Sequence, residues 1–336
     1  MGALRARGPQ ADLVDELLAF ADVDACVNRL KSLPIVSENV SASDRRGLER
    51  ALRAATLVFG RKLAKFLGGP ARDLLEAYML HYQIDNLTTL FRRSITHEEG
   101  LTESALYPVK PFHVSDREIA LLDSPDKVIE LAKGVPLKAM SREAFSVYQA
   151  SGGDIFRFEL SLDRQYLQLL WNKAGRLDPI ERAKVTKEIL LPYIGMNAFV
   201  WALWLQAYHG MGGAELAGLL PLPRSVMRPD VYIEIARAEN VQDAARAIVG
   251  PLRPAIAEIL RHDPGSDVSK WERLSRNNMW RRVSRRDLSA SFGILNILSM
   301  MIRWELLVDD LVTVLNGKAL GMARENIEPL LATKAA

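Results

Sequence analysis

The adjacent acids Asp309 and Asp310 come nearest, in residue type and spacing, to a metal site. Paired aspartates on a helix bind Mg²⁺ in isoprenoid synthases, because this ion prefers carboxylate oxygens. Those enzymes need a DDxxD spacing and a second acid-rich motif. Here Leu311 and Val312 follow, and Thr313 stands where the third acid would be. An all-α enzyme that uses Asp309 and Asp310 is therefore the alternative that the sequence favours least.

The other reactive side chains form no catalytic or metal-binding motif. The five histidines lack ligand spacing, and His97 is followed by two glutamates without the second histidine of a zinc helix. The glycine-rich stretches at 68–70 and 210–213 follow no strand and lack the Lys-Ser/Thr ending of a phosphate loop. No serine or cysteine nucleophile motif is present. We therefore predict no catalytic residue, no bound metal ion and no cofactor.

The strongest charge feature is a basic segment at 273–286, flanked and interrupted by Trp271 and Trp280. Apart from Arg273, its arginines are candidate partner contacts: Arg276, Arg281, Arg282, Arg285 and Arg286. Three interpretations stay open, namely a solvated helix face, a contact with a protein or an anionic lipid, and binding of nucleic acid. The formal net charge of +3 is too small to indicate nucleic acid by itself, so no nucleic-acid partner is predicted.

The elements that would position these residues are predicted to be helices. With 336 residues, 49% of them hydrophobic and 25% charged, the chain has a globular composition and the length of several domain-sized units. No segment shows sustained alternation of apolar and polar residues, and no strand–helix–strand rhythm is present. Asp178, Pro179 and Glu181 form a helix start, and Pro192 predicts a kink or break in that helix. The predicted fold class is all-α.

No segment has the composition of a signal peptide or the length of a membrane span. The longest apolar runs cover residues 198–205 and 292–302, and Asn296 and Ser299 interrupt the second. A membrane-spanning helix needs about 20 apolar residues, so neither run qualifies. The single Cys26 cannot form an internal disulfide, which fits a reducing compartment. We expect a cytoplasmic protein that is soluble or held at a membrane only through its partners.

One helical element recurs three times, at residues 74–106, 190–220 and 301–331. Each copy is predicted to be a long amphipathic helix, a turn and the start of a second helix, with a period of roughly 110 residues. A glycine follows the helix in each copy, at Gly100, Gly210 and Gly321. Three polar residues of the first copy fall on three of the third: Asp85, Asn86 and Thr89 on Asp309, Asp310 and Thr313.

This repetition predicts the domain organisation and a role for the polar residues. Three helical units are expected, at residues 1–115, 116–225 and 226–336. A polar trio that recurs at the same place in two units is more readily explained by architecture than by chemistry. We expect it to make hydrogen bonds between helices at equivalent joints. Repeats of this kind are typical of scaffolds, whose stability comes from stacking one unit on the next.

The three copies resemble elements of the family of C and d subunits found in rotary V-type and A-type ATPases. LLEAYMLHYQIDNLTTLFRR resembles the first helical element of that family, and WELLVDDLVTVLNGKALGMARENIEPLL is similar to its closing element. The most specific piece is Asn-Gly-Lys-Ala-Leu-Gly at 316–321, and residues 158–166 resemble the family's entry to the middle unit. The resemblance covers the chain from about residue 12 to residue 331. It departs from the family pattern at Asn197, Phe199, Leu307 and Asp310.

This resemblance implies a three-unit, all-helical funnel on the cytoplasmic face of a membrane rotor ring, with one copy in each complex. In that family the open mouth of the funnel receives the lower end of the central shaft. The protein passes torque between the ATP-hydrolysing head and the ion-carrying ring, and it has no catalytic site of its own. The expected partners are the shaft proteins and the membrane rotor ring. The main alternative is a general helical-repeat scaffold that binds unrelated proteins.

Overall fold

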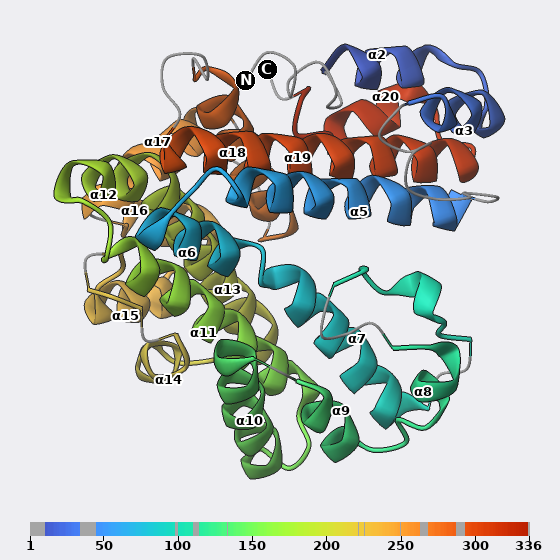
Figure 1. Cartoon of the computed structure of the whole chain (residues 1–336). Helices are drawn as coiled ribbons and strands as arrows, with labels where there is room; N and C mark the ends of the chain where they lie inside the picture. Colours follow the sequence, from blue (N-terminus) through green and yellow to red (C-terminus); the bar gives the residue numbers. More distant parts are fainter. Residues whose placement is uncertain are drawn as a thin grey trace. The chain divides into compact units, whose positions relative to one another are not determined.

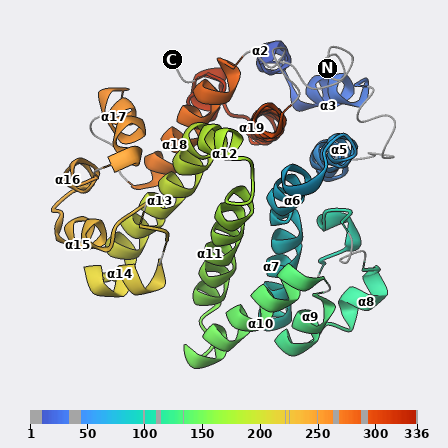
Figure 2. The same cartoon turned by 60° about the vertical axis from the view of Figure 1, so that its left-hand side comes forward.

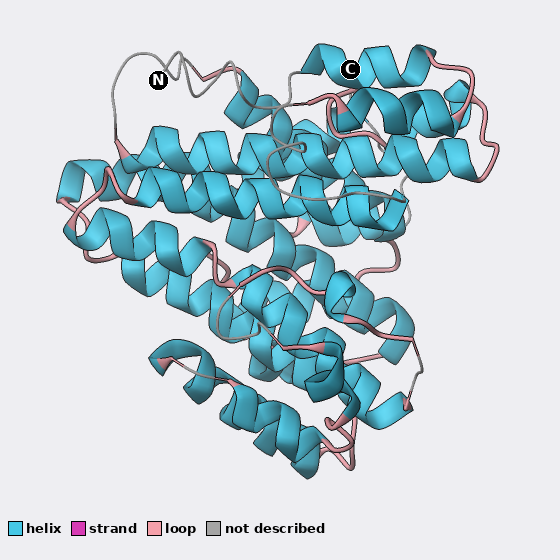
Figure 3. Ribbon diagram, turned by 45° about the vertical axis from the view of Figure 1, so that its right-hand side comes forward, coloured by secondary structure: helices cyan, strands magenta, loops and turns pink. Residues whose placement is uncertain are grey.

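The computed structural model describes residues 11–33, 45–97, 100–109, 114–132, 134–220, 222–224, 226–248, 250–262, 268–286 and 293–334. Within these ranges every regular element is a helix and no strand is present, as Figure 3 shows. The predicted all-α fold class is confirmed. By its internal contacts the chain divides into two compact units, Leu30–Lys173 and a second that joins Met1–Arg29 to Ala174–Ala336. The division into three repeats stays a prediction.

The unit Leu30–Lys173 has its longest helices in α5 and α11 (Figure 1). Its helices follow in the order α5 (Arg45–Ala64), α6 (Gly69–Tyr78), α7 (His81–Thr96), the 3-10 turn η1 (Glu103–Ala105), α8 (Asp116–Ala120), α9 (Pro125–Leu131), α10 (Val135–Ala150) and α11 (Ile155–Ala174). Figure 2 shows α7 and α11 side by side. Phe91 of α7 stacks on Phe158 of α11 with ring centroids 3.6 Å apart. Both rings are buried, so this stack lies in the core of the unit.

The first copy of the repeated element is not the single long helix that was predicted. It breaks at Met79 and Leu80, between α6 and α7. The Tyr166 hydroxyl donates a hydrogen bond to the Tyr78 carbonyl at 3.0 Å, and His81 Nδ1 lies 2.6 Å from the same oxygen. These side chains compete for the carbonyl that would continue the helical ladder. The prediction that a second helix begins after the turn is also wrong, because the described residues up to 106 form only the 3-10 turn η1.

The other unit is arranged around α19 (Ile294–Ala319), which packs against α2, α12 and α18. It begins with α2 (Ala11–Ala19) and α3 (Val23–Lys31), the second of which runs past the boundary at Arg29. After the boundary at Ala174 come α12 (Pro179–Val185), the π-helical turn η2 (Thr186–Leu190), α13 (Leu191–His209), α14 (Gly213–Leu219), α15 (Pro229–Arg237), α16 (Val241–Arg246), the 3-10 turn η3 (Gly250–Leu252), α17 (Arg253–His262) and α18 (Val268–Ser284). After α19 the chain ends with α20 (Arg324–Ile327) and the 3-10 turn η4 (Glu328–Leu330).

Of two local predictions for the segment from α12 to α13, the helix start is confirmed and the kink or break at Pro192 takes another form. Asp178 is the N-cap of α12, and its side chain accepts a hydrogen bond from the Ile180 main-chain N at 3.0 Å, with proline in the first turn. The irregularity predicted at Pro192 takes the form of the π-helical turn η2. Proline cannot donate to the residue four positions earlier, and a wider turn accommodates that missing bond without ending the helix.

The helical segment Pro179–His209 is long and apolar enough to cross a membrane by length and composition, and it is the one such segment in the described part of the chain. In its most apolar window, 67% of the helix is buried inside the protein. Phe199 packs edge-to-face against Trp271 of α18 with ring centroids 5.1 Å apart. A helix that is apolar on several sides is explained here by its burial between neighbouring helices.

Candidate functional site

The acidic pair on α19 binds other parts of its own unit. Asp310 is fully buried, and its two carboxylate oxygens accept hydrogen bonds from the main-chain N of Ala332 at 2.9 Å and of Thr333 at 2.8 Å. Burial raises the pKa of Asp310, although these hydrogen bonds and Arg276 act in the opposite direction. Arg276 Nη2 of α18 lies 3.3 Å from Asp309 Oδ2. Among the described residues, no group of three or more His, Cys, Asp or Glu side chains is placed to hold a metal ion.

Asn86, the residue aligned with Asp310, makes a joint of the same kind in the other unit. It is buried on α7, its Nδ2 donates to the Tyr107 carbonyl at 2.9 Å, and its Oδ1 accepts from the Tyr107 main-chain N at 2.8 Å. Each side chain thereby holds the main chain of a segment a little over 20 residues downstream, 21 residues for Asn86 and 22 for Asp310 with Ala332. These bonds join a helix to a returning segment, whereas the sequence suggested bonds between helices.

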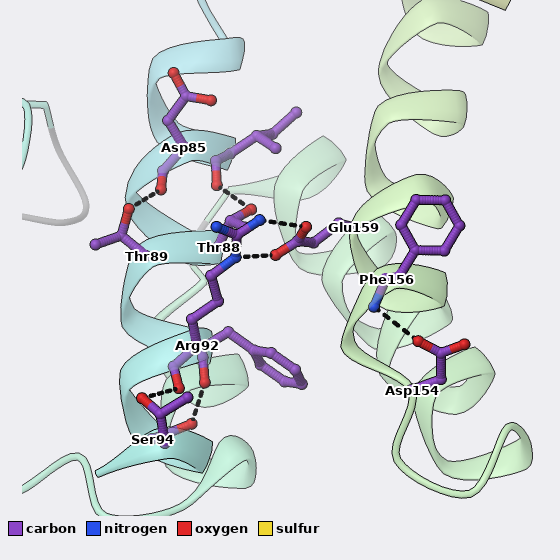
Figure 4. A network of polar contacts seen from close by, with 11 residues as sticks. Asp85, Thr88, Thr89, Arg92, Ser94, Asp154, Phe156 and Glu159 are labelled. Carbon is purple, nitrogen blue, oxygen red and sulfur yellow. Dashed lines mark hydrogen bonds and ion pairs between the residues drawn. The ribbon is translucent and has the colours of Figure 1, made fainter. Parts of the chain in front are cut away.

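Thr89 and Thr313 make the same local bond in their two helices. Each hydroxyl donates to the carbonyl four residues earlier, Asp85 for Thr89 and Asp309 for Thr313, at 2.8 Å in both cases. Figure 4 shows the first of these bonds beside Thr88 and Arg92. Threonines inside helices often make this bond, so it distinguishes the repeat less than the Asn86 and Asp310 joints do.

The glycines that align after each repeat copy all have a positive φ. Gly100, Gly210 and Gly321 have φ values of 91°, 61° and 68°, in the left-handed region that side chains rarely adopt. Gly210 and Gly321 take this conformation at the ends of α13 and α19, where glycine commonly ends a helix, whereas α7 ends earlier, with His97 in the left-handed conformation. The middle copy lacks the polar joint, because the buried Phe199 takes the position that Asn86 and Asp310 occupy in the others.

The basic segment covers α18 from Arg273 to its end and the two arginines after it, and most of its arginines have partners within their own unit. Arg276 contacts Asp309, and Arg281 Nη1 lies 3.9 Å from Glu258. The other pairs are Arg282 Nε to Asn278 Oδ1 at 2.9 Å, Arg286 Nε to Asn296 Oδ1 at 3.2 Å, and Arg286 Nη1 to Glu188 at 3.8 Å. Arg285 is exposed to solvent. Arg276, Arg281 and Arg286 therefore contact neighbouring elements, whereas Arg282 contacts its own helix.

A charged cleft in the unit Leu30–Lys173 was not predicted from the sequence. Its volume is about 660 Å³, and it lies between α5, α7, α11 and the segment 100–107. The charged residues that line it are Glu49, Arg50 and Arg53 of α5, Asp85 and Arg92 of α7, and Glu159 and Asp163 of α11. The spacing of Glu159 and Asp163 places both on one face of α11, but no local signal shows that this face meets α7.

Arg92 and Glu159 connect the two helices across this cleft (Figure 4). Arg92 Nη2 donates to Glu159 Oε2 at 2.6 Å, and Nε donates to Oε1 of the same carboxylate. This is a two-point contact, the geometry in which a guanidinium binds a carboxylate most specifically. Burial, followed by the charges of Asp85 and Glu159, raises the pKa of Asp163 to about 7. Asp163 therefore titrates near neutral pH, unlike an ordinary aspartate.

The comparison with known proteins agrees with the resemblance found in the sequence. No curated protein gives a significant match to the chain. The family model described as ATP synthase (C/AC39) subunit matches residues 4–330. This match covers nearly the whole chain, including the first two copies of the repeated element and all but the last residue of the third. The protein belongs to the ATP synthase (C/AC39) subunit family.

Proposed function

We propose that this protein is a non-catalytic rotor subunit that connects the central shaft of a V/A-type rotary ATPase to its ion-carrying membrane ring. The observation that carries the proposal is the family match over residues 4–330, which makes the chain a subunit of an ATP synthase complex. In this role the protein lies in the cytoplasm, bound to the membrane through the complex and present once per complex. The proposal includes three repeats arranged as a funnel, because a pseudo-threefold shape suits a part that lies on a rotation axis.

A part that passes torque must resist deformation, and the packing inside each unit supports that role. α19 is buried along most of its length, and close-packed interiors transmit strain instead of absorbing it. Lys318 Nζ near the end of α19 donates to the main-chain oxygens of Leu18 at 3.1 Å and Phe20 at 2.6 Å. A lysine ammonium is favourable at a helix C-terminus, so this contact fixes the end of α2. Asp310, also in α19, fixes the C-terminal segment to α19 through its bond with the main-chain N of Ala332.

The rotor and a general scaffold differ in their partners, so purification tests the proposal. A tagged chain is purified from its own cells in mild detergent, and the proteins that accompany it are identified. The rotor proposal predicts head, shaft and ring subunits in fixed proportion, with one copy of this chain. A preparation that contains unrelated proteins and no ATPase subunits would favour the scaffold.

A further inference from the structure

The arginines that line the charged cleft between α5, α7 and α11 bind groups of the cleft wall. Arg50 Nε donates to the Leu106 carbonyl at 3.1 Å, and Arg53 Nη1 donates to the Tyr107 hydroxyl at 2.7 Å. Arg92 is held by Glu159. Arg50, Arg53 and Arg92 thus each have an acceptor in the wall of the cleft.

Among the described residues, the negative charge of Asp163 is not balanced by a positive charge or a hydrogen-bond donor. Within the part of the chain that the structure describes, it makes no hydrogen bond or ion pair, and the charges that act on it are the like charges of Asp85 and Glu159. Burial and repulsion together keep its pKa raised, to about 7. A carboxylate in this setting gains more from a new cation than an exposed carboxylate does, because the interaction is screened less by water.

The arrangement of the cleft favours one kind of cation. No group of three or more possible metal ligands exists among the described residues, so a cationic side chain suits the cleft better than a metal ion. The cleft is open to solvent and about 660 Å³ in volume, which is ample for a long side chain with an ammonium or guanidinium group at its end. Such a group interacts with several separated oxygens at once.

We propose that this cleft is a docking site for a lysine or arginine side chain of a neighbouring subunit, held by Asp163. This inference rests on the proposed function, which supplies other subunits as the available partners. Charge complementarity of this kind fixes the register of two proteins and accelerates their association. Docking also favours the ionised form of Asp163, so it strengthens as the pH rises through 7.

The test is site-specific photo-crosslinking in the purified complex. Ala105 is exposed and lines the cleft, so Ala105→p-benzoylphenylalanine places the probe at its edge. Leu121→p-benzoylphenylalanine is the control, because Leu121 is exposed in the same unit but outside the cleft. We expect the probe at 105 to capture a segment of another subunit that carries a lysine or arginine. Asp163→Asn lowers this yield about tenfold, and Glu130→Gln, an exposed acid elsewhere in the unit, leaves it unchanged.

Two results of this experiment would overturn the inference even if the chain purifies with ATPase subunits. One is that the probe at 105 captures nothing, or a segment without a basic residue. The other is that Asp163→Asn leaves the yield unchanged. If the chain does not purify with ATPase subunits, the proposed function fails, and the cleft is tested on the isolated chain. Acetylated tetralysine should then bind the wild type at pH 8 and bind Asp163→Asn several-fold more weakly, and equal binding would refute the site.

Discussion

At the scale of single residues, Asp163 makes the stability of its unit depend on pH. Its pKa is about 7 in the folded protein, against an ordinary value of 3.8, so the folded state binds the proton more tightly than the unfolded state. The free energy of unfolding therefore falls as the pH rises from about 4 to about 7, and this contribution is constant outside that window. Asp163→Asn should remove this fall in the free energy of unfolding, because asparagine has no carboxyl group to titrate.

The measurement is urea denaturation of both proteins at pH 4 and at pH 8. Asp163→Asn should raise the free energy of unfolding at pH 8 by on the order of 1–3 kcal/mol relative to its effect at pH 4. Glu130→Gln, at an exposed position, should change little at either pH. If Asp163→Asn has the same effect at both values, Asp163 has an ordinary pKa and this account of the cleft is wrong.

The polar joint at Asp310 should contribute to stability through its two acceptor oxygens. Asp310→Asn replaces one oxygen with an amide NH₂ group, which then faces a main-chain N–H in a buried site. We expect a loss of about 1–3 kcal/mol in the free energy of unfolding, the usual cost of a buried donor without an acceptor. Asp309→Asn is the control, because the Asp309 side chain is 44% exposed and its ion pair with Arg276 contributes little. The free energy of unfolding is measured by urea denaturation. Equal losses for the two variants would show that the two acceptor oxygens of Asp310 contribute no more to stability than the exposed Asp309 does.

At the scale of elements, the motif Asn-Gly-Lys-Ala-Leu-Gly at 316–321 has a separate structural reason at each of three positions. A Cβ at Gly317 would lie 2.7 Å from Ile327 Cδ1, so glycine allows α20 to approach α19. Lys318 holds the end of α2, and Gly321 has a positive φ. This explains why the motif was the most specific piece of the sequence.

Gly317→Ala should therefore destabilise the protein, although alanine ordinarily favours a helix. The helical preference contributes about 1 kcal/mol in favour of alanine. Contact with the fully buried Ile327 opposes it by roughly 1–3 kcal/mol, so we expect a net loss in the free energy of unfolding. Gly218→Ala in α14 is the matched control, because its Cβ would meet nothing within 4 Å, and it should stabilise. A stabilising Gly317→Ala would show that α20 moves aside.

The sequence predicted those elements whose causes are local. The N-cap at Asp178 depends on residues within one helical turn and could be predicted, and Pro192 indicated a local disturbance, although the helix continues through a π-helical turn without breaking. The break between α6 and α7 could not be predicted, because the hydroxyl that occupies the Tyr78 carbonyl comes from Tyr166, 88 residues away. The cleft was missed for the same reason, since α5, α7 and α11 are brought together only by the fold. The alignment of the repeat copies predicted that Asn86 and Asp310 make equivalent joints, but it did not predict that their partners are main-chain groups.

At the scale of the whole molecule, the account predicts a protein that does no chemistry. The acidic pair Asp309–Asp310 is engaged by main-chain N–H groups and by Arg276, so Mg²⁺ and diphosphate together should not stabilise the protein. A thermal-shift titration measures this, with Tm expected to stay within about 1 °C of the ligand-free value. Binding to the folded state raises Tm by mass action, so a clear, saturating increase would support the enzyme alternative.

The most direct test of the rotor proposal is to observe whether this protein turns within the complex. Leu121 is 61% exposed and Cys26 is fully buried, so Leu121→Cys offers a selective site for attaching a gold particle. The complex is immobilised through its ATP-hydrolysing head and supplied with ATP under a microscope. The account predicts stepwise rotation of the particle in one direction, which stops when ATP is removed. A particle that stays fixed while the same complexes hydrolyse ATP would contradict it, because the protein would then belong to the stationary part or lie outside the torque path.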